Sequence, residues 1–318
     1  MLLSVVIPVF NNAAALDECL ASFGQEPSFG GEVEYIVVDD GSEVPVAMDI
    51  QGVRILHTSH CGAAHARNEG IAAAMGDFLW FVDADDRIDS SMMKDLLQVL
   101  RKLSGVADLF HTGPMVEVPS RDAIVHTHSC SVEDTKGIKR TRLFVPHTAY
   151  LDHTTYLVSR RLLEKFPDLR YPCRTILEDS LFVLYLIEKA KVVFVNETMH
   201  PYLHQAWRHS STSGAWNEER CNRFVPDICA FFDYFRNYLV RHSEIELADE
   251  CYCRMRYLYL RVLVVKGCTW SLLNDYRRKV YGQKDIAQEK GSLREILLSV
   301  PAVCRTLAFV CRKIRRKQ

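Results

Sequence analysis

The chain has 318 residues, of which 48% are hydrophobic and 25% charged, and its formal net charge is −1. This composition excludes extended disorder and allows one large α/β domain with an accessory segment. The eleven cysteines form no C-x-x-C pair, which favours buried free thiols over a disulfide framework or a zinc site. No apolar stretch is long enough to span a bilayer, and the apolar start of the chain lacks the basic region of a signal peptide.

Strand and helix patterns alternate through the first hundred residues. Short apolar runs typical of buried strands cover 3–9, 34–38, 53–56 and 78–82. Apolar residues recur at helical spacing after Asn11 or Asn12, small residues cover 63–75, and an amphipathic pattern covers 89–103. This alternation gives right-handed crossovers, so it predicts an α/β fold with a mostly parallel central sheet flanked by helices.

The second half of the chain is less regular. Residues 108–118 resemble a strand pair interrupted by Gly113 and Pro114, and the polar segment 120–152 shows weak periodicity, which predicts loops. Helical spacing returns at 159–166 and 179–190, a strand is expected at 192–195, and the pattern beyond 217 is helical. We see no internal repeats.

Three carboxylates, Asp83, Asp85 and Asp86, follow the apolar run 78–82. Such crowded acids repel one another, and in an open α/β sheet the carboxyl ends of strands are where ligands bind. Hard oxygen ligands in this pattern suit Mg²⁺ or Mn²⁺ completed by a substrate phosphate. The alternative is an acidic loop that caps the next helix through Asp89 or Ser90, which leaves the other acids without a role.

The first strand-to-helix turn, 8–12, contains no glycine. A dinucleotide-binding enzyme uses glycines there for close approach of the backbone to a pyrophosphate. The sequence therefore argues against that class, and a bound pyrophosphate would need a cation at the acidic cluster.

Four segments in this order resemble the inverting family-2 glycosyltransferases of the GT-A fold: VIPVFN at 6–11, VVDDGS at 37–42, GAAHARNEGI at 62–71 and FVDADD at 81–86. The resemblance resumes at 177–179 and, more loosely, at 202–213. It implies a GT-A catalytic domain over 1–216, with a nucleotide-sugar-binding half at 1–115 and an acceptor half at 116–216. Residues 217–318 form a helical C-terminal region outside it.

The resemblance also implies which residues bind the donor. Asp39 matches the acid that accepts the N3–H of a pyrimidine, although a turn-initiating Asp before Gly41 is the alternative. Arg67 matches the arginine near the base and phosphates, rather than a surface cation, and Asn68 is expected to support the loop. The full set of implied donor-binding residues is Pro8, Val9, Phe10, Asn11, Asp39, Arg67, Asp83, Ala84 and Arg208.

The same resemblance implies the metal ligands and the general base. Asp85 is expected to be the direct ligand of Mn²⁺ or Mg²⁺, with Asp83 and His204 as further ligands. The family places its general base on the second acid of a Glu-Asp pair, which here is Asp179, with Glu178 beside it. Inverting transfer is a single displacement, so one carboxylate takes the proton of the acceptor hydroxyl. Taken alone, the two acids could simply be first-turn residues favoured by a helix dipole.

The expected activity is transfer of one sugar from a nucleotide-diphosphate sugar, a UDP-sugar in particular, to a glycan or lipid-linked glycan acceptor. Polysaccharide synthesis, such as that of capsule or lipopolysaccharide, is the implied pathway. Residues 205–208 carry the letters of the processive-synthase motif Gln-x-x-Arg-Trp in the wrong order, which argues against a processive enzyme. The alternatives are a non-catalytic nucleotide-sugar-binding or scaffold protein and, more weakly, a phosphohydrolase.

Basic residues are concentrated in the C-terminal region, and acidic residues predominate in the rest of the chain. Residues 261–318 carry fourteen Lys or Arg and four acids, whereas the first 260 residues carry 25 basic and 36 acidic side chains. An apolar stripe at helical spacing runs from Leu293 to Ile314, with the basic residues mainly off it. This pattern predicts peripheral binding to an anionic membrane surface, against the alternative of a helix packed on the domain. We expect a cytoplasmic protein on the inner face of the plasma membrane, with no nucleic-acid partner.

Overall fold

The computed structural model describes residues 1–24, 28–48, 50–118, 131–138, 151–173, 175, 177–205, 216–242, 256, 259–260, 263 and 268–281. The chain divides into two compact units. Unit 1 comprises 1–140, 150–174 and 178–208, and unit 2 comprises 141–149, 175–177 and 209–318.

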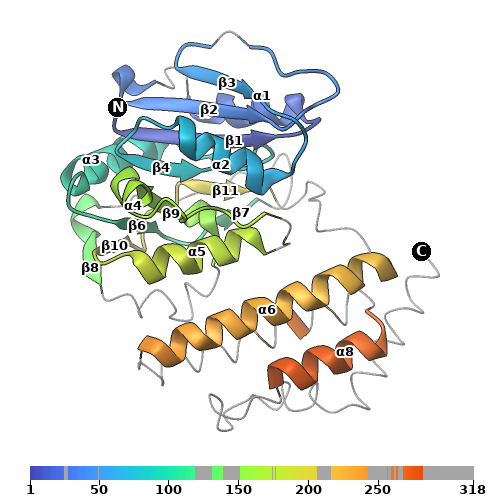
Figure 1. Ribbon diagram of the computed structural model, residues 1–318. Coiled ribbons are helices and arrows are strands. Elements are labelled where there is room, and N and C mark those ends of the chain that lie inside the picture. Colours follow the sequence, from blue (N-terminus) through green and yellow to red (C-terminus); the bar gives the residue numbers. More distant parts are fainter. Residues whose placement is uncertain are drawn as a thin grey trace. The chain divides into compact units, whose positions relative to one another are not determined.

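An eight-stranded sheet forms the centre of unit 1, in the order β3-β2-β1-β4-β9-β6-β10-β8 (Figure 1). Its strands are β1 (Leu3–Val9), β2 (Val33–Asp39), β3 (Val53–His57), β4 (Phe78–Phe81), β6 (Leu109–Thr112), β8 (Lys136–Ile138), β9 (Tyr156–Ser159) and β10 (Val193–Asn196). The pairs β1–β2, β1–β4, β2–β3 and β6–β10 are parallel, whereas β9 runs antiparallel to β4 and β6, and β8 antiparallel to β10. The predicted α/β fold with a mostly parallel sheet is therefore confirmed.

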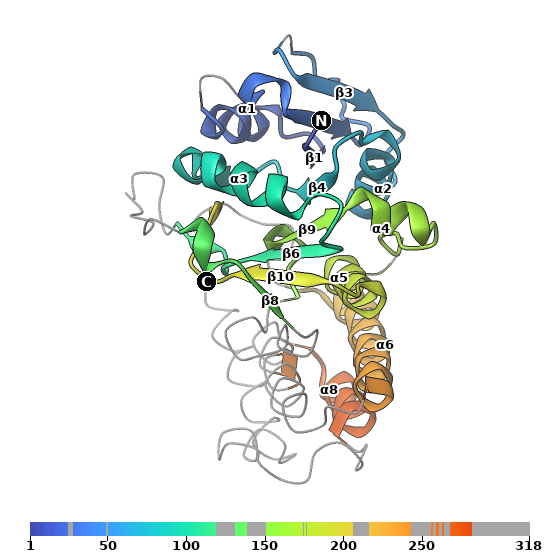
Figure 2. The same cartoon turned by 90° about the vertical axis from the view of Figure 1, so that its left-hand side faces the viewer.

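Helices cover both faces of this sheet (Figure 2). One face carries α1 (Ala13–Ser22) and α3 (Met93–Leu103), and the other carries α2 (Ala63–Ala73), α4 (Arg160–Lys165) and α5 (Glu178–Lys189). Because successive side chains of a strand point to opposite faces, Val5 and Ile7 of β1 join the core under α1 and α3, and Val6 faces α2. Gly70 of α2 packs so closely on β1 that a Cβ there would lie 2.2 Å from Val6 Cγ1.

A second, three-stranded sheet lies within unit 1, in the order β5-β11-β7. Its strands are β5 (Arg87–Ile88), β7 (Val116–Glu117) and β11 (Tyr202–His204). The pairing of Tyr202 with Ile88 and of Leu203 with Arg87 brings the chain after residue 200 beside the acidic cluster that follows β4. The small sheet is thus one means by which distant segments meet at that cluster.

Unit 2 is helical in the part that the structure describes. It contains α6 (Glu218–His242), α8 (Trp270–Tyr276) and a short π-helical segment, Arg277–Tyr281. Phe232 of α6 packs against Tyr276 of α8 with ring centroids 6.1 Å apart, and the Tyr276 hydroxyl donates to the Arg256 carbonyl at 2.7 Å. The predicted helical character beyond 217 is present in these residues, whereas the basic tail lies outside the described residues.

Several element predictions need correction. The sequence pattern missed β9, because only four residues separate the short helix η5 (His153–Thr155) from the start of α4, and Ser159 serves both as strand residue and as helix cap. It also missed the short strands β5, β8 and β11. The helix expected from residue 89 begins as a 3-10 turn, Ser90–Met92, capped by Asp89, before α3.

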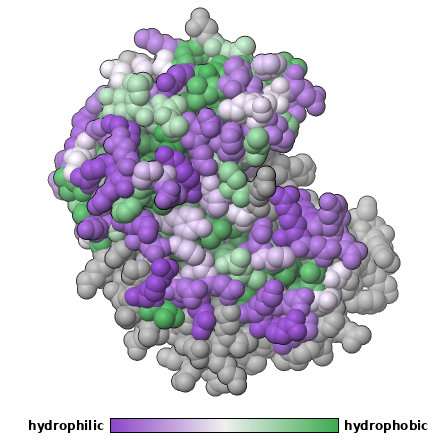
Figure 3. Space-filling model, in the orientation of Figure 1, coloured by the Kyte–Doolittle hydropathy of each residue, from purple (hydrophilic) through white to green (hydrophobic). Residues whose placement is uncertain are grey.

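Hydrophilic side chains cover much of the described surface in one view, with apolar side chains gathered in smaller patches (Figure 3). This distribution agrees with a buried apolar core between sheet and helices. Among the helices that the structure describes, none combines the length and hydropathy that crossing a bilayer requires.

Candidate functional site

The loop after β2 is held together by Asp39 and Asn11. The Asp39 carboxylate, 1% exposed, accepts from the backbone N–H groups of Ser42 and Val46 at 3.0 Å each, and His57 Nδ1 lies 3.1 Å away. Burial opposes the charged form, but these hydrogen bonds lower the pKa of Asp39 to about 2. Asn11 adopts a positive φ of 51° and accepts from the Glu43 N–H, a conformation that Asn tolerates better than most residues.

Asp40, which the sequence interpretation did not single out, organises the loop before α2. Its two carboxylate oxygens accept from the N–H groups of Cys61 and Gly62 at 2.9 and 2.8 Å, and His60 Nδ1 lies 2.9 Å from it. Gly41 is required because its φ is 76° and a Cβ would lie 2.6 Å from the backbone nitrogen of His60. His60 stacks on the exposed ring of Phe10, with centroids 4.0 Å apart, so an aromatic surface stands at this edge of the sheet.

Arg67 of α2 is buried rather than at the surface. Its Nη2 donates to Asp83 Oδ1 at 2.8 Å, and its Nη1 donates to Glu178 Oε1 at 3.4 Å. Burial disfavours the charged form of Asp83, but Arg67 and His153 hold its pKa well below the usual range. The guanidinium therefore joins two acids that lie far apart in the sequence, one after β4 and one at the start of α5.

Asn68, next to Arg67, supports the neighbouring loop as expected. Its side-chain amide donates to the Tyr171 carbonyl and accepts from the Tyr171 N–H, both at 2.9 Å. The guanidinium carbon of Arg67 lies 5.3 Å from the centroid of the Tyr171 ring. This double hydrogen bond fixes the segment that carries the ring beneath Arg67.

Asp85 and Asp86 have opposite environments. The buried Asp86 carboxylate accepts from the Tyr202 hydroxyl at 2.6 Å and the Gln205 N–H at 2.8 Å, and His204 Nδ1 lies 3.1 Å from both of its oxygens. No described side chain donates to the Asp85 carboxylate. Burial and the neighbouring charges of Asp83 and Asp86 raise the pKa of Asp85.

Asp83, Asp85 and His204 are the metal ligands that the sequence predicts. Among the described residues, no group of three or more His, Cys, Asp or Glu side chains is arranged to hold a metal ion. His204 instead pairs with Asp86, whose hydrogen bond raises the pKa of His204 to about 9. Asp85 fits a cation because it is crowded by negative charge and no side chain in the described part of the chain donates to it, so a metal there would need substrate oxygens to complete its coordination.

Glu178 and Asp179 occupy the first turn of α5. Asp179 Oδ1 accepts from the Ser180 N–H at 2.7 Å. Burial, together with the charges of Glu178 and Asp152, raises the pKa of Asp179 to about 6, although His153 and the Ser180 hydrogen bond oppose the shift. A carboxylate with such a pKa is suited to accept a proton near neutral pH.

The remaining predicted residues lie at the same edge of the sheet or outside the described residues. Pro8 and Val9 pair with Val38 and Asp39 at the carboxyl ends of β1 and β2, and Ala84 is buried within the acidic segment. Arg208 lies outside the described residues. The sequence interpretation missed His153, Tyr171 and Tyr202, whose nearness to the acids follows only from packing.

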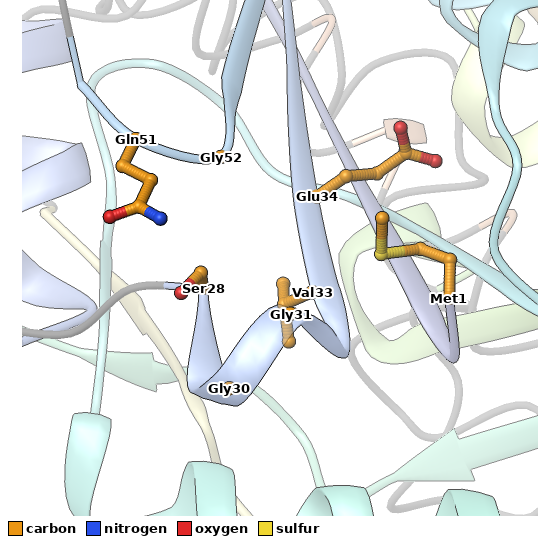
Figure 4. Close-up of a pocket in the computed structure, with 8 residues that line it drawn as sticks. All are labelled: Met1, Ser28, Gly30, Gly31, Val33, Glu34, Gln51 and Gly52. Carbon is orange, nitrogen blue, oxygen red and sulfur yellow. The ribbon is translucent and has the colours of Figure 1, made fainter.

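A pocket lies at the opposite ends of the strands (Figure 4). Because β1 begins at Leu3 and β2 at Val33, this pocket is at the amino ends of the sheet, away from Asp39 and Asp83. Its only side-chain carboxylate, Glu34, accepts from the Ser4 hydroxyl at 2.6 Å and the Met75 N–H at 2.7 Å. The lining residues are Met1, Ser28, Gly30, Gly31, Val33, Glu34, Gln51 and Gly52.

Residues 4–166 match the model of the family described as "Glycosyl transferase family 2". The chain belongs to this family. The chain is also similar to the solved structure of Staphylococcus aureus TarS 1–349 in complex with UDP-GlcNAc. The TM-score is 0.66 at 19% identity, covering 100% of this chain and 93% of that one, which supports the GT-A fold.

Curated relatives match over a shorter stretch. The chain is 36% identical over 109 residues to glycosyltransferase GlyG of Streptococcus pneumoniae, covering 32% of this chain and 36% of the relative. It is 32% identical over 104 residues to the uncharacterized glycosyltransferase EpsJ of Bacillus subtilis, covering 30% of each. It is 31% identical over 103 residues to the poly(ribitol-phosphate) β-N-acetylglucosaminyltransferase TarS, covering 30% of this chain and 18% of the relative. The matched segments thus span about a third of the relatives' length or less.

Proposed function

We propose that this protein transfers a single sugar, with inversion, from a nucleoside-diphosphate sugar to a hydroxyl group of a glycan or lipid-linked glycan. One observation carries the proposal. In unit 1, the ionised Asp83 and the weakly acidic Asp179 belong to one cluster, joined through Arg67 and Glu178. The two acids can therefore serve different roles, one toward the donor and one toward the acceptor.

The donor side is formed by the carboxyl ends of β1, β2 and β4. The exposed Phe10 ring and the loop held by Asp39 offer a surface for a base. Arg67 lies beside Asp83, and the proposal assigns this pair to the sugar and phosphates of the donor. Uridine is the favoured base, since the solved structure of TarS contains UDP-GlcNAc. Arg208 would add a phosphate contact from the segment after β11.

Asp85 and Asp83 would hold Mn²⁺ or Mg²⁺ together with the donor's diphosphate oxygens. When bound, such an ion neutralises the charge that develops on the leaving diphosphate. His204 would contribute only as a neutral imidazole: Nδ1–H could keep donating to Asp86, but Nε2 would have to lose its proton to bind the metal.

Asp179 would act as the general base. As the acceptor oxygen bonds to the anomeric carbon, the bond from that carbon to the diphosphate breaks, and Asp179 takes the hydroxyl proton. Glu178 accepts from Arg67, whereas Asp179 accepts from the Ser180 N–H and has a raised pKa. No nucleophilic side chain is required for a single displacement.

A non-catalytic nucleotide-sugar-binding or scaffold protein is the alternative, with the acids retained for folding. The raised pKa of Asp179 favours catalysis, because a purely structural acid would be expected to gain hydrogen bonds that lower its pKa.

The substitution Asp179→Asn tests the proposal. It keeps the shape of the side chain but cannot accept the proton, so kcat should fall by a factor on the order of 10² to 10⁴. Calorimetric binding of UDP should change little, and Glu188→Gln at the other end of α5 should leave kcat unchanged. Binding without turnover by the unmodified protein, across a panel of UDP-sugars and acceptors, would favour the scaffold.

We also propose that the basic tail places the protein on the anionic inner face of the plasma membrane. The charge separation and the apolar stripe from Leu293 to Ile314 support this proposal. Each basic side chain near such a surface contributes about 1 kcal/mol, so several give reversible, salt-sensitive binding. Removing the chain from Ser292 onward should abolish sedimentation with anionic vesicles at low salt. Sedimentation of both proteins alike would contradict the proposal.

A further inference from the structure

His153 is a buried histidine at the acidic cluster of unit 1 that none of the roles above uses. It is 3% exposed, and neither ring nitrogen has a hydrogen-bond partner among the described residues. Buried polar groups nearly always have partners, so a buried ring with two unpaired nitrogens calls for an explanation. The residues around His153 suggest what this ring does.

The backbone places His153 beside the acidic segment. In the antiparallel pair of β4 and β9, Phe78 lies opposite Ser159 and Trp80 opposite Leu157. Continuing this register brings the residues before β9 next to those after β4. The Trp80 indole N–H donates to the Thr154 carbonyl at 2.6 Å, which secures the short helix carrying His153.

The cap of that helix adds a second constraint. Asp152 accepts from the Thr154 N–H at 2.9 Å and from the Thr154 hydroxyl at 2.8 Å. The position of the His153 backbone is therefore fixed from both sides.

Aromatic rings fix the orientation of the imidazole. His153 lies edge-on to Phe81, with centroids 6.2 Å apart, and edge-on to Tyr171, with centroids 5.7 Å apart. Tyr171 in turn stacks on Phe182 of α5 at 3.9 Å. The ring thus stands in an aromatic enclosure built from the end of β4, the segment before α5 and α5 itself.

From this enclosure, His153 is close to both acids of the proposed reaction. Its Nε2 lies 3.8 Å from Asp83 Oδ1, a distance for charge interaction that is slightly too long for a hydrogen bond. The short helix that carries His153 also packs against α5, which Glu178 and Asp179 begin, and His153 lowers the pKa of Asp179 against the opposing effect of burial.

We propose that His153 is a positioning residue that holds Asp83, on the donor side, and Asp179, on the acceptor side, in a fixed relation within one enclosure. This inference rests on the proposed glycosyl transfer. Reacting groups must be held by side chains whose own rotamers are locked by packing, and the aromatic enclosure provides that locking. A histidine suits the place because it combines a flat ring with two polar atoms at its edge.

Three variants separate this role from a structural one. His153→Phe keeps a flat ring among Phe81 and Tyr171 but removes both nitrogens. His153→Gln retains an amide donor on a side chain long enough to approach the place of Nε2. The matched control is His111→Phe in β6, a histidine that is also buried and edge-on to an aromatic ring, Tyr156 at 4.5 Å, but has no carboxylate among its described contacts.

For His153→Phe we expect kcat to fall at least about tenfold, the KM for the donor to rise a few-fold, and the thermal unfolding midpoint to stay near that of the unmodified protein. His153→Gln should recover part of kcat, and His111→Phe should change neither kcat nor KM. Unchanged kinetics in His153→Phe would overturn the inference. So would a loss of kcat that accompanies a lowered unfolding midpoint and is not recovered in His153→Gln.

A binding measurement distinguishes this inference from the proposed function. If the unmodified protein transfers no sugar, the proposed function fails by that result alone. Titration calorimetry with UDP and Mn²⁺ then tests His153 separately: His153→Phe should bind UDP several-fold more weakly, because Asp83 loses its support, whereas His111→Phe should bind as the unmodified protein does. Equal affinities in all three proteins would overturn the inference.

Discussion

Acidic residues follow both β2 and β4, yet their environments differ. At the carboxyl end of β2, the carboxylates of Asp39 and Asp40 each accept two backbone N–H groups, and each has a histidine beside it. After β4, Asp86 is similarly satisfied, whereas Asp83 relies on Arg67 and His153, and Asp85 has no donor among the described side chains.

An acid at the end of a strand therefore has no fixed role. Backbone donors make Asp39 a strong acid that stabilises a loop, whereas crowding and burial make Asp85 a weaker one that would gain from a cation. Asp179 belongs with Asp85, because its pKa is also raised. We expect acids with a raised pKa, such as Asp85 and Asp179, to take part in the reaction. We expect acids satisfied by backbone donors, such as Asp39, to stabilise the fold.

The largest expected effect on stability is that of Arg67→Met. The substitution leaves Asp83 and Glu178, which are 35% and 21% exposed, without their shared cation. Breaking a buried pair costs about 3–5 kcal/mol, so with partial exposure we expect a loss of about 2–4 kcal/mol in the free energy of unfolding by urea. Arg101→Met, which breaks the exposed pair with Glu32, is the control and should change stability little.

A second prediction uses pH. Between pH 3.8 and about 6 the folded protein keeps a proton on Asp179 that the unfolded chain has released, so this group makes folding less favourable as pH rises through that range. Asp179→Asn removes the penalty. At pH 7 the variant should be roughly 1–3 kcal/mol more stable than the unmodified protein in urea, and the difference should shrink toward pH 4. A difference that does not depend on pH would contradict the assignment.

The third prediction contrasts the two groups of acids directly. Asp39→Asn replaces one accepting oxygen by a donor facing a backbone N–H, which should cost about 1–3 kcal/mol in urea unfolding at pH 7. Asp85→Asn removes a crowded charge without breaking a described side-chain hydrogen bond, so it should cost nothing or stabilise the protein slightly. Equal losses in both variants would remove the distinction between the groups.

Local pattern was enough to predict most of the central sheet and its covering helices. Runs such as 3–9 and 78–82 are long or apolar enough to specify buried strands, and α3 shows clear amphipathic spacing. The strand β9 was missed because it is short and continues directly into a helix, with no turn residue to separate them. Its antiparallel place beside β4 follows from tertiary packing.

The candidate site was predictable only in part, for the same reason. The acids and Arg67 carry recognisable motifs, but the partners that decide their pKa values come from far along the chain. Tyr202, which donates to Asp86, is 116 residues away, and Glu178, which accepts from Arg67, is 111 residues away. His153 and Tyr171 lie in no motif, and only their burial beside the acids reveals them.

The smallest expected effect concerns the proposed cation at Asp85. If Asp85 and Asp83 hold Mn²⁺ or Mg²⁺ against the diphosphate, removing the metal with a chelator should weaken UDP binding about tenfold, or about 1.4 kcal/mol. In Asp85→Ala the same treatment should change the affinity little, because the carboxylate with no described donor is gone.

Asp89→Ala is the matched control for this measurement. Asp89 lies four residues after Asp85, directly after β5, but its carboxylate caps the helix Ser90–Met92 by accepting from the Ser91 N–H, so it belongs with the satisfied acids. Its removal should leave the effect of the chelator intact. If UDP binds equally well to the unmodified protein with and without divalent cation, the metal proposal is wrong. The raised pKa of Asp85 would then reflect burial and the charges of Asp83 and Asp86 alone.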